Sequence, residues 1–252
     1  MTNQEILRIA MEQSARDLGC GAADFLAEEN RVLPWRLGPE AKKYYKKSTS
    51  GILLSYGSGI VAAVHGKLCV AVAEYLRGRE WYCAFGTPDL YRLNECLAAA
   101  GQEVAFLSEY YLPRLERLSL QPCAYELRVL YPADFAELYR PGAWSNALCA
   151  ERRALDVLGV GAYDGDRLVG LAGCSADAPQ MWQIGVDVLP AYRRRGIAAA
   201  LTSHLAQEIL RRGKVPFYCT AWANVPSARN AVTCGFLPAW VEMSIRPQKN
   251  RA

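Results

Sequence analysis

The chain has few of the residues from which metal and redox sites are usually built. Its 252 residues include only two histidines, and its nine cysteines are scattered singly with no Cys-x-x-Cys pair. The sequence therefore indicates neither a zinc site nor a thioredoxin-like redox pair, and we expect no bound metal. Unpaired thiols in this number suit a reducing compartment, so we expect a cytoplasmic protein.

Long hydrophobic runs and a strong charge excess are lacking as well. Every apolar stretch is interrupted by Gly, Ser, Lys or Arg well before 18 residues, so the sequence predicts no membrane span and no membrane partner. Residues 1–5 carry no basic stretch followed by an apolar run, which argues against a signal peptide. The formal net charge is only +4, so we expect no nucleic-acid partner.

The composition is that of a folded protein with a sizeable core. Apolar residues make up 52% and charged residues 21% of a chain whose length suits two domains. Pro113 and Pro122 bracket a polar, basic stretch. We therefore predict an N-terminal α/β domain at residues 1–120 and a second α/β domain at 121–252.

Hydrophobic periodicity and turn residues predict the elements of both halves. In the first half we expect helices over 6–18, 67–78 and 88–100, and strands at 52–56, 60–64 and 104–107. In the second half we expect helices over 133–139 and 145–156, and strands at 125–130, 159–163, 168–174 and 182–188. A long helix, a strand at 216–222, a short helix and a closing strand near 240–245 complete it. The basic run at residues 42–47 is expected to be a solvated loop.

Residues 186–198, Val-Asp-Val-Leu-Pro-Ala-Tyr-Arg-Arg-Arg-Gly-Ile-Ala, are the most informative stretch. A strand ends at Pro190, a basic loop follows, and a helix begins after Gly196. The first turn of a helix has unpaired N–H groups and the positive end of the helix dipole, which together bind anions. Three arginines at such a terminus are unfavourable without an anion. The stretch therefore predicts a site for a phosphate-bearing ligand.

The same stretch resembles the coenzyme A signature of the GNAT acetyltransferase superfamily. Neither the dinucleotide pattern Gly-x-Gly-x-x-Gly nor the Walker pattern occurs. Arg193-x-x-Gly196-x-Ala198 instead follows Val188-Leu189-Pro190, as in that superfamily. Downstream, residues 224–227 (Asn-Val-Pro-Ser) and 235–236 (Gly-Phe) resemble a second family pattern at the matching spacing. The resemblance covers roughly residues 123–246.

The resemblance implies a mixed, splayed β-sheet flanked by helices, with acetyl-CoA as cosubstrate. The N-terminal half is compatible with a degenerate second GNAT-like half and equally with an unrelated α/β accessory domain. Carried over by position, the residues expected to contact coenzyme A are Val186, Val188, Arg193, Arg194, Arg195, Gly196, Ile197, Ala198, Asn224 and Ser227.

The implied activity is acyl-CoA-dependent N-acyl transfer, in which an amine of a small molecule or peptide attacks the acetyl thioester directly. Many relatives place a tyrosine, the acid for the leaving thiolate, where this chain has Ala231. Asp187 is our candidate general base, with Cys219 a weaker one, although an exposed strand-end carboxylate is more often structural. Trp144, Trp182 and Glu151 are candidates for the acceptor pocket, and the tryptophans are equally compatible with the core.

The missing tyrosine keeps a second hypothesis open: a catalytically inactive acyl-CoA sensor or interaction module. A phosphate loop indicates coenzyme binding and does not separate the two. RNA binding is a third interpretation, and it would require a basic stripe across both domains. The sequence does not identify the acceptor, because this superfamily carries many acceptors on one scaffold.

Overall fold

The computed structural model describes residues 1–45, 49–139 and 142–248. The chain forms two compact units. Unit 1 comprises Met1–Ile9 and Tyr111–Pro238, and unit 2 comprises Ala10–Tyr110 and Ala239–Ala252. This division differs from the one expected at residue 120, because the C-terminal strand joins the N-terminal half. Its residues Val241–Ile245 pair with Gly51–Ser55, a partner far away in the sequence that no local pattern indicates.

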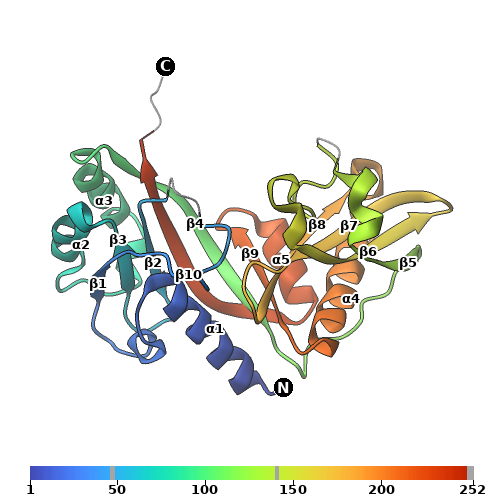
Figure 1. The fold of residues 1–252 in the computed structure, drawn as a ribbon, viewed down its shortest axis with the longest axis horizontal. Coiled ribbons are helices and arrows are strands. Elements are labelled where there is room, and N and C mark those ends of the chain that lie inside the picture. The colour runs from blue at the N-terminus through green and yellow to red at the C-terminus, as the bar shows by residue number, and fades with distance from the viewer. Residues whose placement is uncertain (46–48, 140–141, 249–252) are drawn as a thin grey trace. The chain divides into compact units, whose positions relative to one another are not determined.

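The elements follow one another as a mixed α/β chain (Figure 1). The strands are β1 (Arg31–Pro34), β2 (Gly51–Ser55), β3 (Val61–Val64), β4 (Gln102–Pro113), β5 (Glu126–Leu130), β6 (Asp156–Asp164), β7 (Arg167–Ser175), β8 (Met181–Val188), β9 (Val215–Ala221) and β10 (Phe236–Pro247). The α-helices are α1 (Asn3–Leu18), α2 (Cys69–Leu76), α3 (Asp89–Ala98), α4 (Ile197–Arg211) and α5 (Val225–Thr233). Short 3₁₀ helices are η1 (Ala22–Phe25), η2 (Gly66–Leu68), η3 (Cys83–Phe85), η4 (Pro132–Leu138), η5 (Ala150–Leu155) and η6 (Pro190–Tyr192). The described residues contain no helix long and apolar enough to span a bilayer.

Unit 1 is built on a mixed sheet with the strand order β9-β8-β7-β6-β5. The pairs β5–β6, β6–β7 and β7–β8 are antiparallel, whereas β8 and β9 run parallel. The turn between β6 and β7 contains Gly165, which adopts a positive φ of 61° that glycine tolerates without a Cβ clash. The expected strands of this half lie within a few residues of the observed ones.

Glycine positions show that the two faces of this sheet carry different segments. A Cβ on Gly170 would meet Ile197 and Leu201 of α4, so this face of β7 packs on α4. A Cβ on Gly173 would meet the backbone of Ala147. Because side chains alternate along a strand, residues three apart point to opposite faces. Helix α4 therefore covers one face, and the segment before β6 covers the other (Figure 1).

The two helices expected at 133–139 and 145–156 are wrong in type and extent. The structure has 3₁₀ turns there, η4 and η5, and residues 145–147 form a turn. Helix η5 is kinked at Arg152, whose φ of −135° is not helical. The Oδ2 atom of Asp156 accepts hydrogen bonds from the Cys149 amide (2.8 Å) and the Tyr139 hydroxyl (3.0 Å). These tertiary contacts replace the regular helical pairing that the apolar pattern predicted.

Unit 2 has the strand order β1-β3-β2-β10-β4. The predicted pair around residues 57–59 is confirmed as the antiparallel strands β2 and β3, which are buried along their whole length. Buried residues of α2 and α3, such as Val72 and Leu93, join Leu53 of β2 in one hydrophobic cluster. The helices expected near 67–78 and 88–100 are confirmed as α2 and α3, each shorter at both ends.

The expected solvated loop at residues 42–47 is wrong for its first half. The Lys42 side chain is fully buried, and its Nζ lies 2.6 Å from Oδ2 of Asp17 on α1. Tyr45 is also buried and donates a hydrogen bond to Glu242 (3.1 Å), whereas Lys43 is exposed. Residues 46 and 47 lie outside the described residues. This short run thus contributes Lys42 to a buried ion pair and Lys43 to the protein surface.

Candidate active site

Strands β8 and β9 of unit 1 pair along only part of their length. Their parallel ladder runs from Met181↔Val215 to Ile184↔Tyr218. Strand β8 continues to Val188 and β9 to Ala221, but along these described residues their pairing with each other ends at Ile184↔Tyr218. On its other side, β8 stays paired with β7 as far as Gly170↔Val188. One edge of β8 therefore opens beyond Ile184, as expected for a splayed sheet.

The basic loop leads from this open edge into α4. Pro190–Tyr192 form a 3₁₀ turn, and Arg194 adopts a positive φ of 61°. Gly196 is the N-cap of α4 with a φ of 78°, a left-handed conformation that favours glycine. Among the residues that the structure describes, a Cβ at Gly196 would meet only the Pro122 carbonyl oxygen, at 3.9 Å. The space in front of the helix terminus is therefore open on the side of Gly196.

The three arginines of the loop are exposed around that terminus. The Nε atom of Arg193 donates to the Val188 carbonyl (3.1 Å), which ties the loop to the end of β8. Arg195 donates to the Tyr125 hydroxyl (2.7 Å), and its guanidinium lies 5.3 Å from the centre of the Tyr192 ring. Since the first-turn N–H groups of α4 have no partner within the helix, the terminus offers positive charge and hydrogen-bond donors together.

The second family pattern caps helix α5 and joins a polar chain. The Ser227 amide donates to Oδ1 of Asn224 at 3.3 Å, which is an N-cap contact. The Ser227 hydroxyl lies 2.9 Å from the Tyr218 hydroxyl. Burial raises the pKa of Tyr218, so this phenol stays protonated at neutral pH. Ala231 is fully buried on the same helix.

Asp187, the candidate base, holds the loop at residues 146 and 147 in place. Its Oδ2 accepts hydrogen bonds from the backbone amides of Asn146 (2.8 Å) and Ala147 (3.0 Å). Its Oδ1 accepts one from the Asn146 side chain (2.6 Å). Charge-assisted bonds of this kind are among the stronger ones in proteins. Both carboxylate oxygens are therefore engaged, and the geometry favours the structural role over that of a general base.

Two glycines let this loop lie directly on the sheet. Gly173 of β7 and Gly185 of β8 are register partners. A Cβ on Gly173 would lie 2.1 Å from the Ala147 oxygen, and one on Gly185 would lie 1.8 Å from the Asn146 oxygen. Only residues without a side chain permit so close an approach. The sequence alone does not reveal this pair, because strand register is needed to bring the two glycines together.

The three residues proposed for an acceptor pocket are dispersed. Trp144 is 8% exposed and packs with Phe135 and Leu171 in a small hydrophobic cluster. Trp182 is half-buried against the main core of unit 1. Glu151 is exposed on η5. Trp144 therefore has the structural role that the sequence left open.

A pocket of about 150 Å³ lies on the face of the unit 1 sheet that the segment before β6 covers, which we call the loop-covered face. Its lining includes Asn146, Arg152, Asp177, Gln183 and Gly185. No pattern in the sequence pointed to Arg152 or Asp177, since they meet only through the packing of η5 on the turn after β7. This pocket and the open edge of β8 share the same strand.

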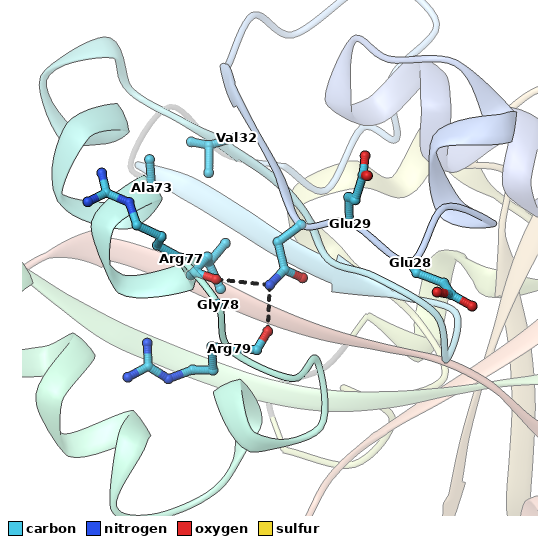
Figure 2. Close-up of a pocket in the computed structure, with 9 residues that line it drawn as sticks. Glu28, Glu29, Val32, Ala73, Arg77, Gly78 and Arg79 are labelled. Atoms are coloured by element: carbon cyan, nitrogen blue, oxygen red, sulfur yellow. Dashed lines mark hydrogen bonds between the residues drawn. The ribbon is translucent and has the colours of Figure 1, made fainter.

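Unit 2 has a larger and more open pocket, of about 550 Å³ (Figure 2). The Asn30 side chain in its lining donates to the carbonyls of Leu76 (3.1 Å) and Arg79 (2.8 Å). Its Oδ1 accepts a hydrogen bond from the Ile60 amide (3.0 Å). The amide thereby links three segments of backbone, which is a structural use of the polar group in this pocket.

Comparison with known proteins points to one family. Residues 123–236 match the model of the Acetyltransferase (GNAT) family. No curated protein matches the chain.

Similar solved structures share low sequence identity with the chain. A GCN5-related N-acetyltransferase-like protein from Streptococcus suis 89/1591 is 18% identical, over 65% of this chain and 69% of that one, with a TM-score of 0.47. A GCN5-related N-acetyltransferase from Kribbella flavida is 16% identical, over 65% of each chain, with a TM-score of 0.48. An aminoglycoside N-acetyltransferase in complex with CoA is 20% identical, over 45% of this chain and 92% of that one, with a TM-score of 0.37.

Proposed function

Because residues 123–236 form a domain of the GNAT acetyltransferase family, we propose that the protein transfers an acetyl group from acetyl-CoA to an amine. The acceptor is a primary amine of a small molecule or a peptide. The observation that carries this proposal is the continuity of the open β8 edge with the left-handed Gly196 loop at the start of α4. Strand β8 offers an extended open edge, and helix α4, which follows it in the chain, offers an anion site at its N-terminus.

The residues of this chain fit a coenzyme with a diphosphate and an amide-bearing arm. The first-turn amides of α4 and the exposed Arg193, Arg194 and Arg195 suit the diphosphate. The backbone of Val186, beyond the last pair with β9, suits an arm that adds to the sheet as a short strand would. Acetyl-CoA would supply the activated thioester, and the protein's part is to bind and orient the two reactants.

The protein's acid–base groups differ from the pattern typical of the family. The hydroxyl that many relatives place at Ala231 is missing here, and Asp187 is engaged by the loop. We assign Asp187 a positioning role, in which it fixes the backbone of Asn146 over the sheet. A thiolate is a good leaving group, so transfer needs no strong acid. An acyl-CoA sensor without turnover is the second candidate, which the alanine at position 231 favours.

The test compares acetyl-CoA binding by calorimetry in the wild type and in Gly196→Asp. The substitution puts a carboxylate at the helix terminus, where it repels phosphate, so we expect at least a tenfold weaker affinity. Thiol release is then followed with a pool of primary amines. Amine-dependent release supports transfer, whereas binding without release from any amine supports the sensor.

Two control variants separate charge from backbone strain. Gly196→Asn has the same shape as the aspartate without its charge, and asparagine tolerates the left-handed region better than most residues. Gly213→Asn places the same residue at a φ of 70° beyond the other end of α4. We expect the order of affinity wild type, Gly213→Asn, Gly196→Asn, Gly196→Asp. Equal binding by wild type and Gly196→Asp, or no binding by the wild type, would show that the loop is only a basic surface.

A further inference from the structure

Three carboxylates serve the loop-covered face of unit 1, and one of them differs from the other two. Asp187 accepts hydrogen bonds on both oxygens from residues 146 and 147. Asp156 does so from Cys149, Tyr139 and Ser175. Both oxygens of the half-buried Asp187 and of the buried Asp156 are thus satisfied by the protein itself.

Asp177 is as buried as Asp156, but among the described residues one of its oxygens has no partner. Its side chain is 1% exposed, and its Oδ1 is ion-paired with Arg152. Within the described structure, its Oδ2 is buried without a hydrogen-bond partner. Leaving a charged acceptor unpaired in the interior costs free energy, so such an atom calls for a partner from outside the chain. Asp177 also lines the 150 Å³ pocket described above.

We propose that Asp177 accepts a hydrogen bond from an N–H group of the acyl acceptor and thereby selects acceptors with two nitrogen functions. This proposal rests on the proposed acetyl transfer. The pocket is bounded by Gly185, the first residue of β8 beyond its last pair with β9. A group held by Asp177 is therefore next to the strand along which the thioester arm would lie.

The chemistry of the site explains why two nitrogens are needed. An amine that donates to a carboxylate as an ammonium ion is protonated and has no lone pair with which to attack. The nitrogen at Asp177 is therefore a binding group, and a second, neutral amine is acetylated. A volume of 150 Å³ corresponds to only about five water molecules. It suits one ammonium or amide group rather than a whole acceptor.

The first experiment tests the subsite without any turnover. Protein ¹⁵N–¹H spectra are recorded while methylammonium, acetamide or tetramethylammonium is added. We expect saturable shifts at the amides of Ala147 and Gly185 with the first two probes, or with one of them, and none with tetramethylammonium, which has no N–H. A response to methylammonium alone identifies an ammonium subsite, and a response to acetamide alone an amide subsite. No shifts, or equal shifts with tetramethylammonium, would refute the proposal.

The matched variants are Asp177→Asn and Asp166→Asn. The first keeps the size of the side chain and removes its charge, and the second makes the same change in the exposed turn after β6. Far-UV spectra and urea unfolding establish that each variant folds. We expect Asp177→Asn to abolish the probe shifts and Asp166→Asn to retain them. Should the folded Asp177→Asn protein keep the shifts at wild-type strength, Asp177 is not the acceptor of the hydrogen bond.

Turnover then tests the selectivity. Thiol release is compared for butylamine, 1,4-diaminobutane and 4-aminobutanamide. We expect at least one of the two difunctional amines to have a kcat/KM about ten- to a hundredfold above butylamine. In Asp177→Asn this advantage should fall severalfold through the KM for the amine, with the KM for acetyl-CoA unchanged. A loss confined to kcat would instead assign Asp177 to proton transfer and overturn the recognition role.

The acetyl-transfer proposal and the Asp177 proposal would fail in different experiments. If the wild type binds no acetyl-CoA, the acetyltransferase proposal fails, and the spectral titration still decides whether Asp177 binds N–H groups. If acetyl-CoA is turned over with butylamine as fast as with both difunctional amines, the transferase stands and the selectivity proposed for Asp177 is wrong.

Discussion

The substitution Gly185→Ala tests how the loop over the sheet is held. The new Cβ would lie 1.8 Å from the Asn146 oxygen and 2.7 Å from its carbonyl carbon. Contact distances between such atoms are about 3.5 Å, so the loop must move by roughly 1.5 Å. Asp187 opposes this movement, because its carboxylate holds the Asn146 and Ala147 amides. The strain therefore falls on a segment with little freedom to relax.

The expected loss of stability follows from these contacts. Overpacking a well-packed site costs about 1–3 kcal/mol, and weakening charge-assisted hydrogen bonds costs about 1.5–3 kcal/mol more. We expect Gly185→Ala to lower the free energy of unfolding by about 3 kcal/mol. For a protein of this size this corresponds to a fall in Tm of roughly 6–12 °C. Urea unfolding followed by far-UV circular dichroism measures the first quantity, and a thermal melt measures the second.

The substitution Gly159→Ala is a control for Gly185→Ala, because its new Cβ would make milder contacts. A Cβ on Gly159 of β6 would lie 3.1 Å from the Ala172 oxygen and 3.2 Å from the Phe135 ring, so only small shifts are needed there. We expect Gly159→Ala to cost less than about 1.5 kcal/mol. If Gly185→Ala is no more destabilising than Gly159→Ala, the close approach of the loop to β8 is wrong.

Two further predictions concern carboxylates, the buried Glu242 and the half-buried Asp187. Burial raises the pKa of Glu242 to about 7, above its ordinary 4.5. Its contribution to stability is therefore present below about pH 4.5 and is lost as the pH rises through about 7, a change of about 3 kcal/mol at 1.36 kcal/mol per pH unit. Urea unfolding at about pH 5 and about pH 8 should show this loss in the wild type and not in Glu242→Gln; an equal pH dependence would contradict the assignment. The substitution Asp187→Asn should cost about 1.5–3 kcal/mol at neutral pH and raise the KM for the amine more than that for acetyl-CoA, measured by thiol release; unchanged stability would show that the loop is held by other contacts.

Much of the region to which we assign coenzyme binding could be predicted from the sequence, because its sequence patterns are local. The loop at residues 189–196 and the cap formed by Asn224 depend on residues within a few positions of one another. The turn at Gly165, whose φ is 61°, is of the same kind. In each case the backbone conformation follows from the residue itself and its immediate neighbours, so a short pattern is sufficient.

The opposite face could not be predicted, because it is assembled from distant residues. The apolar spacing of residues 145–156 is compatible with an α-helix, but Asp156 and Asp187 bind the backbone amides there. Gly173 and Gly185 matter only as register partners, and register cannot be deduced from composition. The placement of β10 beside β2 in unit 2 is a pairing of the same long-range kind.

The contrast between the two faces bears on how acceptor choice is set. Coenzyme binding is assigned to a loop and a helix terminus on the α4 side, whereas Asp156, Asp177 and Asp187 act on the other side. Asp187 is saturated by the loop that it holds, and Asp156 binds both this loop and Ser175 of β7. Substituting either residue therefore changes the shape of the face as a whole. Asp177 has a vacant oxygen, so substituting it should alter what binds there while the loop keeps its position. Changes at Asp177 should therefore alter acceptor choice, while changes at Asp187 should alter the integrity of the loop.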